Sequence, residues 1–137
     1  AAMPESYPDK IVRVRPGDDN FETRRTMNYF TGISENTAGS QGISMNRVVV
    51  PPGGKPAPHS HVGFEAVIYI VSGRVENFYG EGLKESIITE AGDFLYIPPG
   101  VPHQPINMSN SEEAIAIIAR TISAERETDE PYNPDES

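Results

Sequence analysis

Short runs of apolar and β-branched residues, separated by turns rich in Gly and Pro, recur along most of the chain. They predict strands over residues 28–33, 43–50, 59–71, 74–79, 83–89, 94–97, 103–107 and 114–121. The run at 114–121 is almost wholly apolar, which predicts burial on both of its faces. Many short strands with turns between them are typical of a β-sandwich or barrel, and a double-sheet jelly-roll barrel is the natural architecture for a chain of this size.

The two ends of the chain differ in composition from its middle. Residues 1–20 are polar and interrupted by prolines, with one alternating stretch at 11–15 that predicts a short strand. Residues 124–137 are acidic and contain two prolines, so we expect a mobile tail, or one that wraps onto a partner subunit. The chain is therefore divided into an N-terminal arm (1–20), an all-β barrel domain (21–123) and an acidic C-terminal tail (124–137).

Charge and cysteine content exclude several classes of function. The 137-residue chain holds 20 Asp and Glu against 11 Lys and Arg, a formal net charge of −9, and no cysteine. Nucleic acids and anionic membranes require basic surfaces, so neither is an expected partner. The absence of cysteine excludes disulfides, thiolate nucleophiles and cysteine-ligated metal sites. No run approaches the ~20 apolar residues of a membrane-spanning helix, and we expect a cytoplasmic protein.

All three histidines of the chain belong to one pattern. Residues two and four apart on a strand point to the same face, so His59, His61 and Glu65 are expected to project together. His103 follows a loop of three prolines and a glycine, as a further ligand from a distant strand would. A lone histidine is most often a surface or core residue, but imidazoles combined with a carboxylate form a typical metal-ligand set.

The same residues resemble the two sequence motifs of the cupin superfamily. Those that match the first motif are Gly53, His59, His61 and Glu65. Those that match the second motif, in type and in spacing, are Gly92, Pro98, Gly100, His103 and Asn107. The first motif departs once, because seven residues instead of six separate Glu65 from Gly73. The resemblance implies a conical β-barrel, the double-stranded β-helix or jelly roll, with one divalent metal ion inside.

The resemblance also implies which residues hold the metal ion. Its ligands would be His59, His61, Glu65 and His103, which leave two positions of an octahedral ion open for water, substrate or dioxygen. Imidazole with one carboxylate suits Fe, Mn, Ni or Zn as the divalent ion, and the sequence does not choose among them. Gly92 and Gly100 are expected in turns, and Asn107 as a structural hydrogen-bond partner.

The pocket around the metal is harder to assign. If the strand alternation continues beyond Glu65, Val67 and Tyr69 also face the interior. Tyr69 is then a candidate catalytic residue that donates a hydrogen bond or carries a proton, with plain core packing as the alternative. The further candidates for a substrate pocket are Arg47, Phe78, Tyr96, Gln104 and Met108, each of which has packing or solvent exposure as its alternative.

Cupins host many reactions, so the resemblance leaves several function classes open. We expect a metal-dependent enzyme that acts on a small oxygenated molecule, with dioxygenase-type oxidation favoured because no clear protein base for isomerisation is present. The alternatives are a sugar isomerase or epimerase that uses the metal as a Lewis acid, and a non-catalytic small-ligand-binding cupin. We also expect a homodimer in which the arm crosses or covers the partner subunit.

Overall fold

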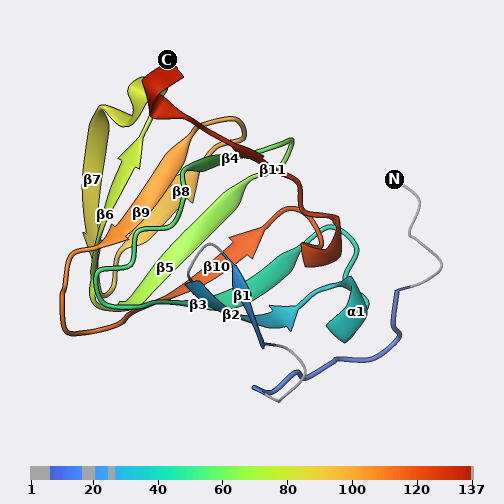
Figure 1. Ribbon diagram of the computed structural model, residues 1–137. Helices are drawn as coiled ribbons and strands as arrows, with labels where there is room; N and C mark the ends of the chain where they lie inside the picture. Colours follow the sequence, from blue (N-terminus) through green and yellow to red (C-terminus); the bar gives the residue numbers. More distant parts are fainter. Residues whose placement is uncertain (1–6, 17–20, 25–26, 137) are drawn as a thin grey trace.

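Two antiparallel β-sheets face each other in the computed structural model, which describes residues 7–16, 21–24 and 27–136 (Figure 1). One sheet has the strand order β1-β2-β3-β10-β5-β8 and the other the order β11-β4-β9-β6-β7. The helical segments are short: α1 (Glu35–Ala38), η2 (Glu81–Leu83), η3 (Ala124–Arg126) and η4 (Pro134–Glu136). The strands are β1 (Phe21–Arg24), β2 (Met27–Ile33), β3 (Ser44–Val50), β4 (His59–His61), β5 (Ala66–Ser72), β6 (Arg74–Tyr79), β7 (Glu85–Glu90), β8 (Phe94–Ile97), β9 (His103–Asn107), β10 (Ala114–Arg120) and β11 (Asp129–Pro131). The expected all-β double-stranded β-helix is thus confirmed.

The long strand expected over 59–71 is broken into β4 and β5. Residues 62–65 form a bend between them, and Gly63 adopts a φ of +77°, which favours glycine. The bend shifts the alternation by one residue, so that Ala66 and Ile70 are buried in the core. Val67 and Tyr69 instead lie on the outer face, 50% and 39% exposed. The inward orientation expected for these two residues is therefore wrong.

The core lies between the two sheets and is built from alternate residues of their strands. In β10, Ala114, Ala116 and Ile118 are buried, whereas the residues between them are only half-buried. The strand pairs with β3 on one side and β5 on the other, so one of its faces covers the core and the other forms the outside of the barrel. Burial of 114–121 on both faces, expected from its apolar composition, is wrong.

The C-terminal segment belongs to the barrel. β11 pairs with β4 in register, and the backbone N–H of Tyr132 donates to the carbonyl of Pro58 at 3.1 Å. The Tyr132 hydroxyl accepts a hydrogen bond from the backbone N–H of Gly82 at 2.7 Å. The expectation that 124–137 stands apart from the barrel is corrected, because the free edge of β4 offers backbone groups for it to pair with.

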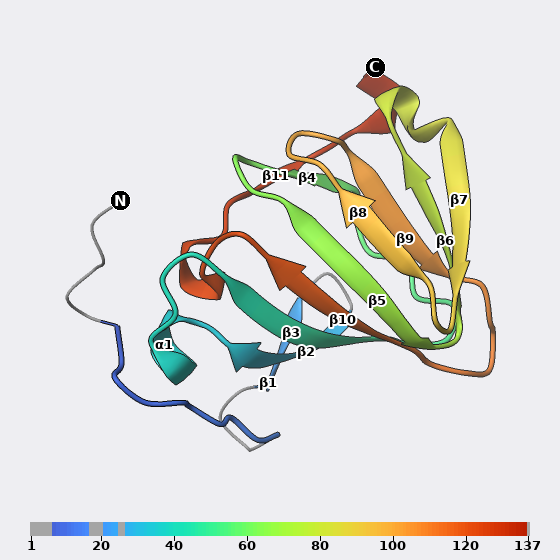
Figure 2. The same cartoon turned by 180° about the vertical axis from the view of Figure 1, so that it is seen from behind.

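The N-terminal arm runs along the outside of the barrel on the side of α1 and β2 (Figures 1 and 2). Its residues 7–16 form no strand, contrary to the expectation for 11–15, and Ile11 is fully exposed. Residues 17–20 lie outside the described part. No helix among the described residues is long and apolar enough to cross a membrane.

Candidate metal centre

Three buried histidines meet inside the barrel. His59 and His61 lie on the same face of β4, and His59 pairs with His103 at the start of β9. Their ring centroids are 4.5 to 5.3 Å apart, and one ring nitrogen from each lies within 4.8 Å of the other two. This spacing allows one metal ion to contact all three imidazoles.

Neighbouring groups fix two of these rings. His103 Nδ1 lies 2.9 Å from the carbonyl oxygen of Val101, which only accepts hydrogen bonds, so Nδ1 carries the proton and the lone pair of Nε2 is left for a metal. The His61 ring stacks on Phe64, with centroids 4.6 Å apart and planes 22° apart. Phe64 is itself buried, so His61 is held by the packing of the bend.

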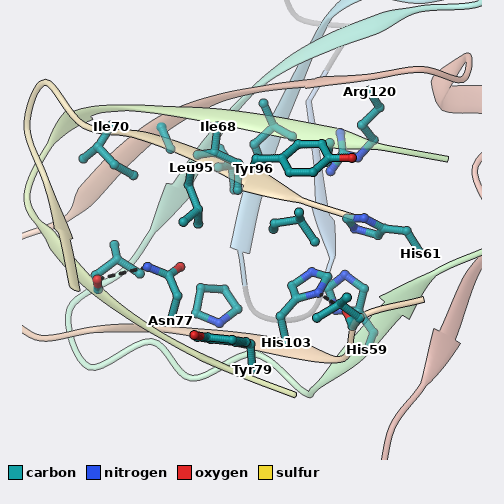
Figure 3. A pocket seen from close by; sticks show the side chains of 18 of the residues that line it. His59, His61, Ile68, Ile70, Asn77, Tyr79, Leu95, Tyr96, His103 and Arg120 are labelled. Atoms are coloured by element: carbon teal, nitrogen blue, oxygen red, sulfur yellow. Dashed lines mark hydrogen bonds between the residues drawn. The ribbon is translucent and has the colours of Figure 1, made fainter. Parts of the chain in front are cut away.

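The three histidines lie at one end of a cavity of about 380 Å³ (Figure 3). Its wall is mainly apolar and includes Val48, Ile68, Ile70, Ile87, Leu95 and Ile118. The other polar side chains of the wall are Tyr29, Asn77, Tyr79, Tyr96 and Arg120, and no aspartate or glutamate of the described residues lines it. The cavity therefore suits a molecule with a mostly apolar body.

Comparison with known proteins agrees with this geometry. The model of the Cupin domain family matches residues 46–119, more than half of the chain. The chain belongs to the cupin family. An uncharacterized protein of Methanocaldococcus jannaschii is 35% identical over 71 residues, which cover 49% of this chain and 51% of that protein. This cupin spans about half or less of the length of the curated relatives that it matches.

Solved structures share the fold of this cupin at low identity. An oxalate oxidase superposes with a TM-score of 0.70 at 22% identity, over 93% of this chain and 67% of that one. A sugar phosphate isomerase of the cupin superfamily from Silicibacter pomeroyi superposes with a TM-score of 0.63 at 18% identity, over 79% and 66% of the two chains. At such identities the likeness establishes the barrel and leaves the reaction open.

Glu65, the fourth expected ligand, is not grouped with the histidines. Its side chain is exposed, and its carboxylate Oε1 accepts a hydrogen bond of 2.7 Å from the Tyr96 hydroxyl. This hydrogen bond raises the pKa of the Tyr96 phenol above its ordinary value. Because the bend shifts the alternation, Ala66 lines the cavity where Glu65 was expected. The structure thus brings three of the four expected ligands together.

Of the five candidate pocket residues, only Tyr96 lines the cavity. Arg47 lies over the ring of Phe30 on β2, and Gln104 Nε2 donates to the carbonyl of Pro56 at 2.8 Å. Phe78 and Met108 are also absent from the cavity wall.

Tyr69, the candidate catalytic residue, packs against Phe94 on the outer face with ring centroids 4.9 Å apart.

The sequence analysis did not identify four polar residues of the cavity wall, which are Tyr29, Asn77, Tyr79 and Arg120. Arg120 occupies the inward alternation of β10, two residues after the buried Ile118. An arginine at an inward position of an apolar strand was the available signal. Asn77 likewise follows the inward Val75 on β6, and its Nδ2 donates to the Thr89 hydroxyl at 3.1 Å.

The second motif behaves as expected. Gly92 and Gly100 adopt φ values of +94° and +78° in their turns. The backbone N–H of Gly100 donates to the carbonyl of His61 at 2.9 Å, which ties this loop to β4. Asn107 is buried, and its Nδ2 donates to the backbone carbonyls of Val50, Pro51 and Glu112. These hydrogen bonds confirm that Asn107 has a structural role.

Proposed function

We propose that this cupin binds one divalent metal ion through His59, His61 and His103, and uses it to oxidise a small molecule with dioxygen. The observation that carries the proposal is the position of the three imidazoles at the end of a mainly apolar cavity. Three protein ligands leave coordination positions open, as in the non-haem Fe(II) oxygenases. When bound, the metal would bring dioxygen and the substrate's oxygen donors together.

The remaining residues of the cavity favour oxidation over sugar isomerisation. Isomerisation requires a base that moves a proton between carbons, and the described cavity wall holds no carboxylate for this role. A sugar would also need many polar partners, whereas most of the wall is apolar. In the proposed reaction a carbon–carbon bond of the substrate breaks and both atoms of dioxygen enter the products, so no further reductant is needed.

Oxygen uptake tests this proposal. Protein purified without added metal is first analysed for bound metals, then stripped, loaded anaerobically with Fe(II) and mixed with dioxygen and a catechol, a 1,3-diketone or a sugar. We expect uptake with a catechol or diketone, and both atoms of labelled dioxygen in the products. His103→Ala is the matched negative control. An isomerised sugar without oxygen uptake would instead establish the Lewis-acid function, and ligand binding without turnover would establish a binding module.

We also propose that the chain forms a homodimer through its N-terminal arm. The middle of the arm, residues 10–15, carries Lys10, Arg13 and Arg15 and no acidic residue, whereas the chain as a whole has a net charge of −9. The outer face of β5 and β8 exposes apolar side chains, among them Phe94 at 80%. Residues 11–15 of a second copy alternate apolar side chains with arginines, so their apolar side chains would cover this face. Light scattering should give a dimer for the full chain and a monomer for a variant that lacks residues 1–19; a full-chain monomer would contradict the proposal.

A further inference from the structure

Arg120 places a buried cation in the wall of the cavity. It is the last residue of β10, where it pairs with Ala66 of β5 and Ser44 of β3. Its side chain is only 3% exposed and lines the cavity. In Figure 3 it enters at the end that holds His61, whereas Ile70 lies toward the opposite end. The register agrees with this view, because Ala66 begins β5 just after the bend that follows His61.

The guanidinium of Arg120 has more donors than the protein satisfies. Nη1 donates to Asn46 Oδ1 at 2.9 Å. Nε lies 3.5 Å from Glu127 Oε2 and has no hydrogen-bond partner among the described residues. A guanidinium carries five N–H groups, and buried donors without acceptors are costly and uncommon in native proteins. Because Nε lies toward Glu127, the donors left for a ligand in the cavity are the N–H groups of Nη1 and Nη2 other than the one that Asn46 accepts.

We propose that Arg120 binds a carboxylate group of the substrate, so that the catechol or diketone which this cupin oxidises carries one carboxylate on a mainly apolar body. The planar fork of a guanidinium matches a carboxylate, and their hydrogen bonds are charge-assisted. The apolar body of the acid would extend along Ile68 and Leu95 toward Ile70. The assignment rests on the proposed function only for where the acid reacts; the carboxylate site itself requires no metal.

Two features of the cavity support an acid as the ligand. Ala66, which pairs with Arg120 across β5 and β10, also lines the cavity and adds only a methyl group to this part of its wall. No carboxylate among the described residues lines the cavity itself, because Glu127 contacts Arg120 from outside the cavity wall. Glu127 is also only 3% exposed, so this ion pair is shielded from water and fixes the guanidinium in place.

Calorimetry on the metal-free full chain tests the assignment. The probes are 4-methylpentanoate and its neutral amide, 4-methylpentanamide, which share one apolar body. Arg120 is the one arginine or lysine among the described residues that line the cavity, so it is the cationic side chain that an acid would meet there. We expect the carboxylate to bind at least about tenfold more tightly than the amide.

The variants are chosen to change the binding of the acid without unfolding the protein. Because loss of Arg120 alone would leave Glu127 buried without its cation, the test variant is the double change Arg120→Gln/Glu127→Gln. It should lose the preference for the acid and keep its affinity for the amide, with an unchanged circular dichroism spectrum. Arg47→Gln, an arginine outside the cavity, is the control and should keep the preference. If the double variant misfolds, Glu127→Gln tests the role of Arg120 instead. This variant keeps Arg120 and should bind the acid at least as tightly as the wild type.

Equal binding of acid and amide by the wild type, or an acid preference that survives the double change, would overturn the assignment. So would a Glu127→Gln variant that folds but binds the acid more weakly. None of these measurements involves metal or dioxygen. A failure of oxygen uptake therefore counts against the proposed oxidation alone, and a failure of acid binding counts against Arg120 alone.

Discussion

The two regions that carry the cupin motifs differ in how directly their sequence determines their geometry. From β8 to β9, each matched residue has the role that its spacing predicts: Gly100 turns the loop, His103 enters the cavity and Asn107 ties backbone carbonyls together. From β4 to β5, His59 and His61 meet as expected but Glu65 turns outward to Tyr96. The difference teaches that alternation is reliable within one strand and is lost across a bend.

The largest expected effect tests whether both regions supply metal ligands. His61→Ala and His103→Ala each remove one of three imidazoles, and we expect metal affinity to fall by well over tenfold, since even loss of a group that only orients a ligand costs about 10- to 100-fold. Metal content after dialysis against a weak chelator measures this. Acidification should also release the metal as the imidazoles protonate. Full occupancy in both variants would show that the site lies elsewhere.

The next largest effect is on the free energy of unfolding, and it is expected for a residue of the second motif. Asn107→Ala removes a buried amide that donates to three backbone carbonyls, including that of the buried Val50, so we expect the free energy of unfolding to fall by about 1–3 kcal/mol. Urea denaturation measures the loss. Asn110→Ala is the matched control, because Asn110 is exposed three residues away and should change stability little. Equal stability of the two variants would contradict the structural role of Asn107.

These expectations also show how far the sequence alone could lead. Most strands, the grouping of the three histidines and the turn glycines follow from local patterns. The bend at 62–65 does not, because its only trace is one additional residue between Glu65 and Gly73. β11 was not predicted because its acidic sequence has no strand pattern of its own. It forms a strand by pairing with the edge of β4 in the folded barrel. Arg120 was missed because its cavity exists only after three strands have come together.

The alternation shift itself can be tested by moving the carboxylate one residue along the chain. Ala66→Glu places it on the side that faces the cavity, so we expect a fourth ligand and a metal affinity about tenfold higher. The melting temperature should then rise more on metal addition than it does in the wild type. Ala66→Gln, which has the same size but no charge, is the control and should not show this gain. A loss of metal in Glu65→Ala, with no gain in Ala66→Glu, would restore Glu65 as the ligand.

The smallest effect is expected at Glu65, where the first motif departs from its spacing. Glu65→Ala should leave metal content unchanged and should lower the pKa of Tyr96 toward its ordinary value, because the carboxylate accepts the phenol's hydrogen bond and disfavours the phenolate. Because the pKa of the Tyr96 phenol is raised, this hydrogen bond stabilises the folded state at neutral pH. The stabilisation is lost as the pH rises through the pKa that Tyr96 has in the folded protein. Phenolate absorbance during alkaline titration measures the shift.

Because the chain has six tyrosines, Tyr96→Phe is needed to identify the Tyr96 signal by difference. In the Tyr96→Phe background, Glu65→Ala should no longer change the phenolate titration. A change that persists in that background would mean that Glu65 acts on another tyrosine. An unchanged titration in the single variant would mean that the carboxylate does not hold the Tyr96 hydroxyl in solution, and Glu65 would then be free to reach the metal. Metal content and phenolate absorbance, both measured on Glu65→Ala, thus decide whether the Glu65 carboxylate binds the metal inside the barrel or the Tyr96 hydroxyl outside it.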